Sequence, residues 1–63
     1  MVITYGYIGF KGEYYDMTNT LKGMKISATR RGITSIYQRC GYVVTKVSEK
    51  LDGKWHDINR ENI

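Results

Sequence analysis

Alternating apolar and polar residues near the start of the chain predict two strands. Residues 2–10 and 13–19 are rich in Tyr, Ile, Val and Thr, which favour extended structure. The two segments flank Lys11–Gly12, where glycine supplies the positive φ that a two-residue turn needs. We therefore expect a β-hairpin with a two-residue turn at these positions.

The strand period of two sorts the side chains of this hairpin onto two faces. In the expected register, one face is apolar and belongs to the core: Gly6, Ile8, Phe10, Tyr15 and Met17. The other face is dominated by tyrosine and is expected to meet solvent: Tyr5, Tyr7, Tyr14, Asp16 and Thr18.

A helix is predicted over about residues 30–40. Thr29 is an acceptable N-cap, and Gly41 supplies the left-handed residue that ends many helices. Gly32 in the first turn costs about 1 kcal/mol relative to Ala, so the helix needs a sheet to hold it. Its apolar residues recur at the i, i+3, i+4 and i+7 spacing of one helical face: Ile33, Ile36, Tyr37 and Cys40.

A second hairpin is predicted near the end of the chain. Val43 to Val47 favour a strand, Asp52–Gly53 is a strong two-residue turn signal, and Trp55 to Ile58 form the returning strand. Pairing across this turn places Leu51 opposite Lys54, Lys50 opposite Trp55, and Val47 opposite Ile58.

These elements predict an α+β fold in the order ββ(β)αββ. The bracketed strand is a short extended segment in which Met24, Ile26 and Ala28 alternate with polar residues. Two hairpins would form a small antiparallel sheet of four to five strands, with the single helix packed on one face. The 63 residues fit one small domain, 1–63, whose last residues, 59–63, are expected to fray.

Composition excludes several classes of protein. A hydrophobic fraction of 41% with 13% aromatic residues is too high for a disordered tail. The longest apolar runs have two or three residues, so we expect neither a membrane span nor a signal peptide. The single cysteine, Cys40, forms no internal disulfide and no cysteine zinc site. A reducing, cytoplasmic location is therefore expected.

Positive charge is concentrated in the middle of the chain. Residues 21–46 contain six cations and no acid, whereas each flanking segment is close to neutral, so this middle segment accounts for the net charge of +4. Such segregation attracts nucleic acid, anionic lipid headgroups or an acidic protein surface. The alternative is a solvated face that only keeps the protein soluble. The cations are Lys22, Lys25, Arg30, Arg31, Arg39 and Lys46.

Residues for catalysis are scarce. His56 is the only histidine and Cys40 the only thiol, and they lie on different predicted elements. The chain contains no phosphate-binding loop, metalloprotease motif or calcium loop. A chain this short also lacks the walls of a substrate pocket. We expect no catalytic residue, no metal and no cofactor.

Arg30 and Arg31 stand at the start of the expected helix, where the helix dipole disfavours cations. Residues that violate a local structural preference without a visible gain in stability indicate a functional site. Helix N–H groups together with two guanidinium groups would bind an oxyanion such as phosphate, and Lys22 and Lys25 would extend the site. The alternative is that both arginines point into water and bind nothing.

The tyrosine face has three possible roles. Tyr5, Tyr7 and Tyr14 would offer planar groups on which unstacked bases stack, flanked by basic residues. Tyrosine is equally common at protein interfaces, and it is also a good strand former.

The sequence favours a small, non-catalytic, nucleic-acid-binding accessory or regulatory protein. Its cations would contact backbone phosphates, and its tyrosines would contact bases or sugars. The alternative is an adaptor or inhibitor, in the style of small phage and mobile-element proteins, that docks on a larger protein. The tyrosine face or a sheet edge would then make the contact, and the basic segment would steer it to an acidic surface. A homodimer through a sheet edge is a variant of this alternative. The phosphate-contacting set is Arg30, Arg31, Lys22, Lys25 and Arg39, with Tyr5, Tyr7 and Tyr14 on the bases.

Overall fold

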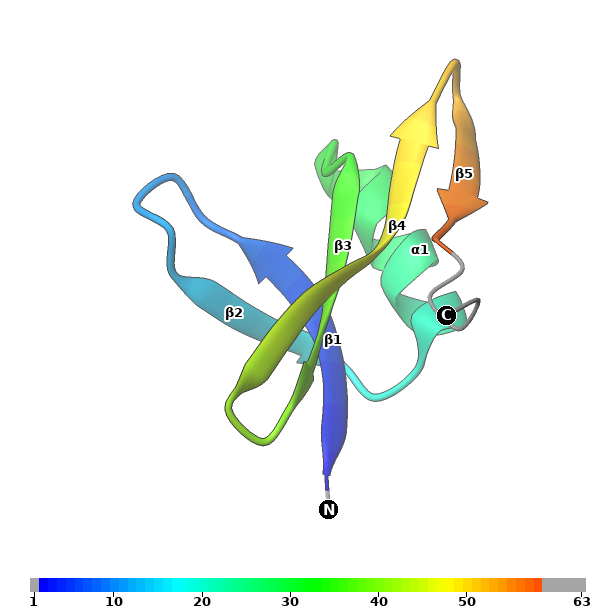
Figure 1. Cartoon of the computed structure of the whole chain (residues 1–63). Coiled ribbons are helices and arrows are strands. Elements are labelled where there is room, and N and C mark those ends of the chain that lie inside the picture. Colours follow the sequence, from blue (N-terminus) through cyan, green and yellow to red (C-terminus); the bar gives the residue numbers. More distant parts are fainter. Residues whose placement is uncertain (1, 59–63) are drawn as a thin grey trace.

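Figure 1 shows a computed structural model of the chain, in which residues 2–58 are described. Within that range one helix packs on one side of a five-stranded antiparallel sheet of order β2-β1-β3-β4-β5. This confirms the α+β class; the expected fraying of 59–63 lies outside the described residues. The elements are β1 (Ile3–Ile8), β2 (Tyr14–Thr18), α1 (Leu21–Arg31), β3 (Ser35–Cys40), β4 (Val43–Leu51) and β5 (Lys54–Asp57).

The helix lies earlier in the chain than predicted. α1 covers the segment predicted as a third strand, and most of the predicted helix over 30–40 forms β3. The side chain of Thr20 caps α1 by accepting a hydrogen bond from the Gly23 N–H, and Gly32 ends it in the left-handed region with φ of 75°. The predicted boundaries at Thr29 and Gly41 are therefore wrong, and the element order is ββαβββ.

Two apolar patterns compete in this region, which explains the wrong placement. Leu21, Met24 and Ala28 follow the helical period, whereas Ile26, counted in the alternating pattern, is 53% exposed. Residues 33–37 are rich in β-branched and aromatic types, which favour the centre of a sheet. Gly32 ends α1, whereas the sequence predicted it in the first turn of a helix.

The first hairpin forms, and Tyr5 lies opposite Thr18 as the predicted turn requires, but from Gly6 to Ile8 the register differs by one residue from the prediction. Residues 9–13 make a longer loop, closed by a 2.7 Å hydrogen bond from the Gly9 N–H to the Glu13 carbonyl oxygen, so the two-residue turn is wrong. As a result Tyr7 lies opposite Tyr15, and Ile8 lies opposite Tyr14. A shift of one residue moves the side chains of one strand to the other face relative to its partner.

Strands β1 and β2 approach each other closely at Gly6. The β1–β2 register is irregular between Tyr5 and Gly6, and a Cβ on Gly6 would overlap the carbonyl oxygen of Tyr15. The β1–β3 ladder ends at the pair Gly6–Tyr37. Beyond this point the β1–β2 hairpin turns away from β3, as Figure 1 shows.

The second hairpin is confirmed. Leu51 pairs with Lys54, and Lys50 pairs with Trp55, across the turn at Asp52–Gly53. The Ile58 N–H donates a 2.9 Å hydrogen bond to the Val47 carbonyl oxygen. The third predicted pair, Val47 with Ile58, is therefore also joined. β4 also pairs with β3 and so connects this hairpin to the rest of the sheet.

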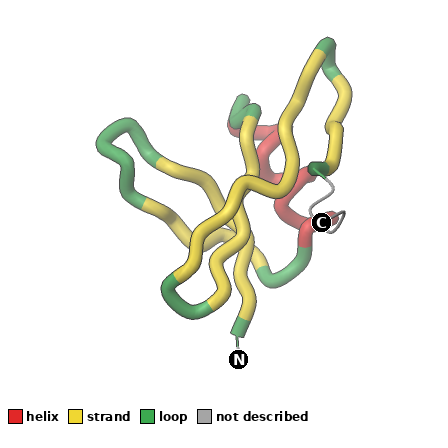
Figure 2. Tube along the Cα trace, in the orientation of Figure 1, coloured by secondary structure: helices red, strands yellow, loops and turns green. Residues whose placement is uncertain are grey.

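The core lies between α1 and one face of the sheet, here called the helix side. Its fully buried residues are Met24 and Ala28 from α1 and Ile36 from β3. No helix of the described chain covers the opposite face, the open side, as Figure 2 shows. The one helix of residues 2–58 is not long and apolar enough to cross a membrane. Partly buried residues around the core are Tyr5, Met17, Leu21, Ile33, Val47 and Trp55.

Candidate nucleic-acid interface

Helix α1 carries the densest positive charge of the described chain. Four of its eleven residues are basic and none is acidic. The side chains of Lys22, Arg30 and Arg31 are exposed, while Lys25 is half-buried beside β5. The exposed residues Lys22, Ile26 and Arg30 recur every four positions, so they share the outer side of the helix, away from the core.

Ion pairing separates these cations into two groups. Lys25 Nζ lies 2.9 Å from Asp57 Oδ1 and thereby connects α1 to the end of β5. Within residues 2–58, Lys22, Arg30 and Arg31 have no ion-pair or hydrogen-bond partner for their side chains. These three cations form what we call the basic ridge, and no side chain in the described part of the chain neutralises their charge.

The position of Arg30 and Arg31 overturns one sequence-based expectation. They lie in the last turn of α1 and not in its first. Cations are favoured there, because the carbonyl end of the helix carries partial negative charge. The expected anion site at a helix N-terminus, assembled from N–H groups and these arginines, is therefore wrong, and any anion contacts the side chains alone.

Arg39 lies apart from the basic ridge, on the open side of the sheet. Its Nη2 is 3.3 Å from Asp16 Oδ2, and its guanidinium carbon is 5.8 Å from the centre of the Tyr14 ring. The Thr4 hydroxyl donates a hydrogen bond to Asp16, and this bond, with a smaller contribution from Arg39, lowers the pKa of Asp16. Arg39 is thus already neutralised within the sheet.

The expected face of Tyr5, Tyr7 and Tyr14 does not form. Tyr5 lies on the helix side, packs against the core, and accepts a 3.2 Å hydrogen bond from Gln38 Nε2. Tyr7 stacks on Tyr15, with 5.2 Å between ring centres. Tyr14 takes the opposite face, under Arg39. The shifted register is the cause, because it pairs Tyr7 with Tyr15 in place of Asp16.

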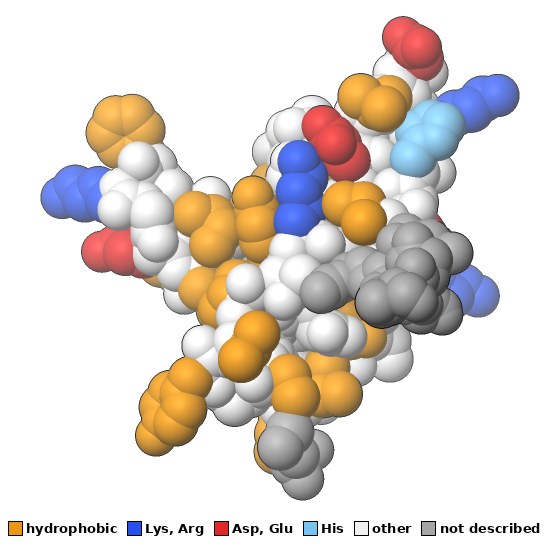
Figure 3. Space-filling model, in the orientation of Figure 1, with side chains coloured by type: hydrophobic (Ala, Val, Ile, Leu, Met, Phe, Trp, Pro, Cys, Tyr) orange, Lys and Arg blue, Asp and Glu red, His pale blue; other side chains and the backbone are white. Residues whose placement is uncertain are grey.

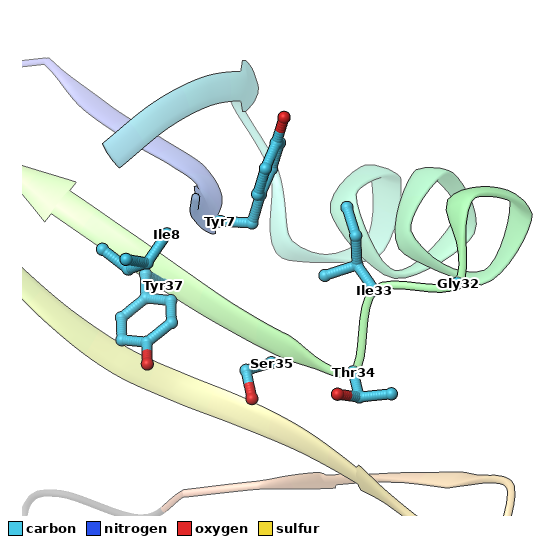
Figure 4. Close-up of a pocket in the computed structure, with 7 residues that line it drawn as sticks. All are labelled: Tyr7, Ile8, Gly32, Ile33, Thr34, Ser35 and Tyr37. Carbon is cyan, nitrogen blue, oxygen red and sulfur yellow. The ribbon is translucent and has the colours of Figure 1, made fainter. Parts of the chain in front are cut away.

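A pocket of about 440 Å³ opens where β1 separates from β3. It is lined by Tyr7 and Ile8 from β1, by residues 32–34 of the loop after α1, and by Ser35 and Tyr37 from β3. Figure 4 shows the side chains of Tyr7 and Ile33 pointing to one side of β3, and those of Ser35 and Tyr37 pointing to the other. The expectation that a chain this short lacks the walls of a pocket is therefore wrong. The pocket depends on where the β1–β3 ladder ends, which no local sequence pattern shows.

The end of the sheet near the β3–β4 turn exposes apolar side chains on both faces. Figure 3 looks onto the open side and shows hydrophobic side chains gathered at its lower end, around the β3–β4 turn. Tyr42 in that turn is 102% exposed, and the neighbouring strand ends add four aliphatic side chains. We call this surface the apolar end; its residues are Val2, Ile3, Tyr42, Val43 and Val44.

The two reactive side chains lie on separate strands. Cys40 ends β3 and is half-buried, and His56 is exposed on β5. The placement of Cys40 on a helical stripe is wrong, because this segment is a strand. Residues 2–58 contain no group of three or more His, Cys, Asp or Glu side chains placed to hold a metal ion.

The pocket lining carries no charge, and the basic ridge on α1 contributes no residue to it; Arg31 only precedes Gly32 of the pocket wall in the chain. Arg39 and Tyr14 occupy the other side of the sheet. Comparison with protein-family models, with curated proteins and with solved structures gives no match to the chain.

Proposed function

We propose that this protein is a binding module, not an enzyme, which binds nucleic acid through the basic ridge of α1. The observation that carries the proposal is the set of three exposed cations, Lys22, Arg30 and Arg31, without a partner among residues 2–58. Backbone phosphates are the anions that such a ridge would neutralise, with release of counterions from the polymer.

Charge on the rest of the described surface supports this choice of face. Arg39 is paired with Asp16, and Lys46 Nζ lies 3.3 Å from Glu49 Oε1, so the open side offers two neutralised pairs. α1 contains no acidic residue that would oppose its own cations. An approaching polyanion is therefore attracted to α1 more strongly than to the open side.

The length of the basic ridge fits a nucleic-acid strand. Eight residues separate Lys22 from Arg30, which corresponds to about 12 Å along a helix axis. Phosphates follow one another at about 3.4 Å of axial rise along one strand of duplex DNA. The ridge would thus span about three phosphate intervals, a short contact that suits an accessory role.

Fluorescence anisotropy with labelled duplex DNA, single-stranded DNA and RNA tests the proposal. We expect binding at low salt that weakens at physiological salt, and a loss of affinity in the double variant Arg30→Gln/Arg31→Gln. The control Lys11→Gln/Lys54→Gln removes the same charge from exposed positions outside α1 and should bind like wild type. No binding by the folded wild type at low salt would contradict the proposal.

A second candidate function, docking on a protein, is favoured by the apolar end. Exposed apolar patches on small proteins are typical of protein contacts, and Tyr42 and Val43 are 102% and 64% exposed. Sedimentation of wild type and of the Tyr42→Ser/Val43→Thr variant would show whether a second copy uses this surface. If the protein is monomeric at all concentrations, a second copy is excluded as the partner. Cross-linking from position 42 would then identify a different protein that binds the apolar end.

A further inference from the structure

The outer side of α1 carries one large apolar side chain between two cations. Ile26 is 53% exposed, whereas the other large apolar side chains of this helix, Leu21 and Met24, belong to the core or pack against it. Lys22 lies about one turn before Ile26, and Arg30 lies about one turn after it. The exposed apolar surface of Ile26 is therefore set among positive charges and is not used by the core.

Helical geometry turns these three side chains in different directions. Residues four apart in an α-helix are rotated by about 40° and lie about 6 Å apart along the axis. When Ile26 points straight away from the core, Lys22 is turned to one side of it and Arg30 to the other. The outer side of α1 thus has an apolar centre with one cation on each flank.

Nothing in the described chain competes for this side of the helix. α1 contains no acidic residue, and the side chains of Lys22 and Arg30 have no ion-pair partner among residues 2–58. Lys25, the cation of α1 that is paired, meets Asp57 at the end of β5 and not on the outer side. The outer side therefore offers uncompensated positive charge on both flanks of one apolar side chain.

The major groove of B-form DNA has the complementary arrangement. It is about 12 Å wide, admits an α-helix, and is bordered by the phosphates of two strands. Its floor presents thymine methyl groups, which accept apolar contacts. A-form RNA has a major groove too deep and narrow for side chains to read. A single strand has only one backbone and therefore matches the cation on one flank alone.

We infer that α1 lies in the major groove of duplex DNA, with Ile26 against a thymine methyl group. Lys22 and Arg30 bind phosphates of the two strands that border the groove. The inference rests on the proposed function and deepens it, because it selects duplex DNA over single strands and duplex RNA. A single apolar contact gives a preference for thymine at the position below Ile26.

Removal of the thymine methyl group tests the contact directly. Fluorescence anisotropy compares a duplex of alternating adenine and thymine with the same duplex carrying deoxyuridine for thymidine, which keeps the charge and the base pairing. Wild type should bind the thymine duplex about fourfold more tightly, as expected for one buried methyl group. Equal binding of the two duplexes by wild type would overturn the inference. Tighter binding of single-stranded DNA or duplex RNA of the same length would also overturn it.

Variants at position 26 show whether Ile26 makes this contact. Ile26→Ser should bind both duplexes as weakly as wild type binds the uracil duplex, whereas Ile26→Leu keeps an apolar side chain and should still prefer thymine. If circular dichroism shows that Ile26→Ser does not fold, Ile26→Gln takes its place, because glutamine favours helices more than serine.

The matched control is Leu51→Ser, the loss of an apolar side chain that is 49% exposed at the end of β4. It should leave the preference for thymine unchanged. If the Ile26 variant keeps the preference as this control does, the methyl group is contacted elsewhere and the inference is wrong.

The failures of the two proposals are distinguishable. Equal binding of the thymine and uracil duplexes, with both weakened by Arg30→Gln/Arg31→Gln, would overturn the groove contact and leave the basic ridge in place. No binding of any of these nucleic acids by folded wild type at low salt would overturn both.

Discussion

Lys25 of α1 and Asp57 of β5 form an ion pair, with 2.9 Å between Nζ and Oδ1. The same carboxylate accepts a 2.9 Å hydrogen bond from the hydroxyl of Ser48, which is fully buried in β4. Lys25 first, and Ser48 second, lower the pKa of Asp57. Three elements that are separate in sequence thus meet at one carboxylate.

Replacing this carboxylate is expected to loosen the contact between β5 and α1. Asp57→Asn removes the ion pair but keeps a carbonyl oxygen for the Ser48 hydroxyl. Because both side chains are partly exposed and screened by solvent, the loss in unfolding free energy should be about 1 kcal/mol or less. Urea denaturation measures it. Asp52→Asn in the β4–β5 turn is the control, and an equal loss there would contradict a specific role for Asp57.

Acid should destabilise the fold in a defined window. Asp16 and Asp57 have pKa values below the ordinary value of 3.8 in the folded chain. Their contribution is complete above the ordinary value and is lost as pH falls through the lower folded values. The free energy of unfolding should therefore fall below about pH 4. The variant Asp16→Asn/Asp57→Asn should show a flatter profile, and an unchanged slope would contradict this origin.

The basic ridge sets the salt dependence of nucleic-acid binding. Three released counterions give a slope of about −2 for the logarithm of the binding constant against the logarithm of salt concentration on single strands. Removing the charges of Arg30 and Arg31 should reduce the slope to about −0.7. Anisotropy at four salt concentrations measures both values. A slope that stays the same in this variant would show that other cations carry the contact.

The small core should make the protein sensitive to one truncation. Ile36→Ala removes one of only three fully buried hydrophobic residues of the described chain, and large-to-small core changes cost about 2–5 kcal/mol. We expect this variant to be largely unfolded at room temperature by circular dichroism. Leu51→Ala, at a position 49% exposed, should stay within about 0.5 kcal/mol of wild type.

Gly6 should tolerate no side chain. A Cβ there overlaps the Tyr15 carbonyl oxygen, so Gly6→Ala must push β1 and β2 apart, at a cost of about 1–3 kcal/mol. Gly12→Ala serves as the comparison, because its Cβ meets no atom within 4 Å and only the φ of 87° is strained. Thermal unfolding should place Gly6→Ala below Gly12→Ala, and the reverse order would contradict the close approach.

Sequence pattern predicted those parts of the fold that depend on local turn chemistry. Asp52–Gly53 specifies both a turn and the register of its strands, and the pairs that follow from it are confirmed. Lys11–Gly12 carries a weaker turn preference, so the register of the first hairpin is decided by packing, including Tyr7 on Tyr15. The tyrosine face was wrong for that reason.

The predicted helix is in the wrong place because a short apolar segment can fit both the helical period of about 3.6 residues and the strand period of two. Ile33, Ile36 and Tyr37 fit a helical stripe, yet Ile36 is buried as a member of a strand paired on both sides. The prediction that Arg30 and Arg31 stand at a helix start is wrong, because both lie in the last turn of α1. The pocket was out of reach, because no local signal shows where a long-range ladder stops.

The strand order has a consequence for the rate of folding. In the described sheet, β1–β2, β3–β4 and β4–β5 join consecutive strands, and only β1–β3 closes a loop, the one that contains β2 and α1. Local pairs form within microseconds, whereas closing a longer loop loses chain entropy first. Docking of β1 on β3 is therefore expected to be the slow step. In stopped-flow experiments, substitutions at the β1–β3 pair should slow folding, while those at the β4–β5 pair should mainly speed unfolding.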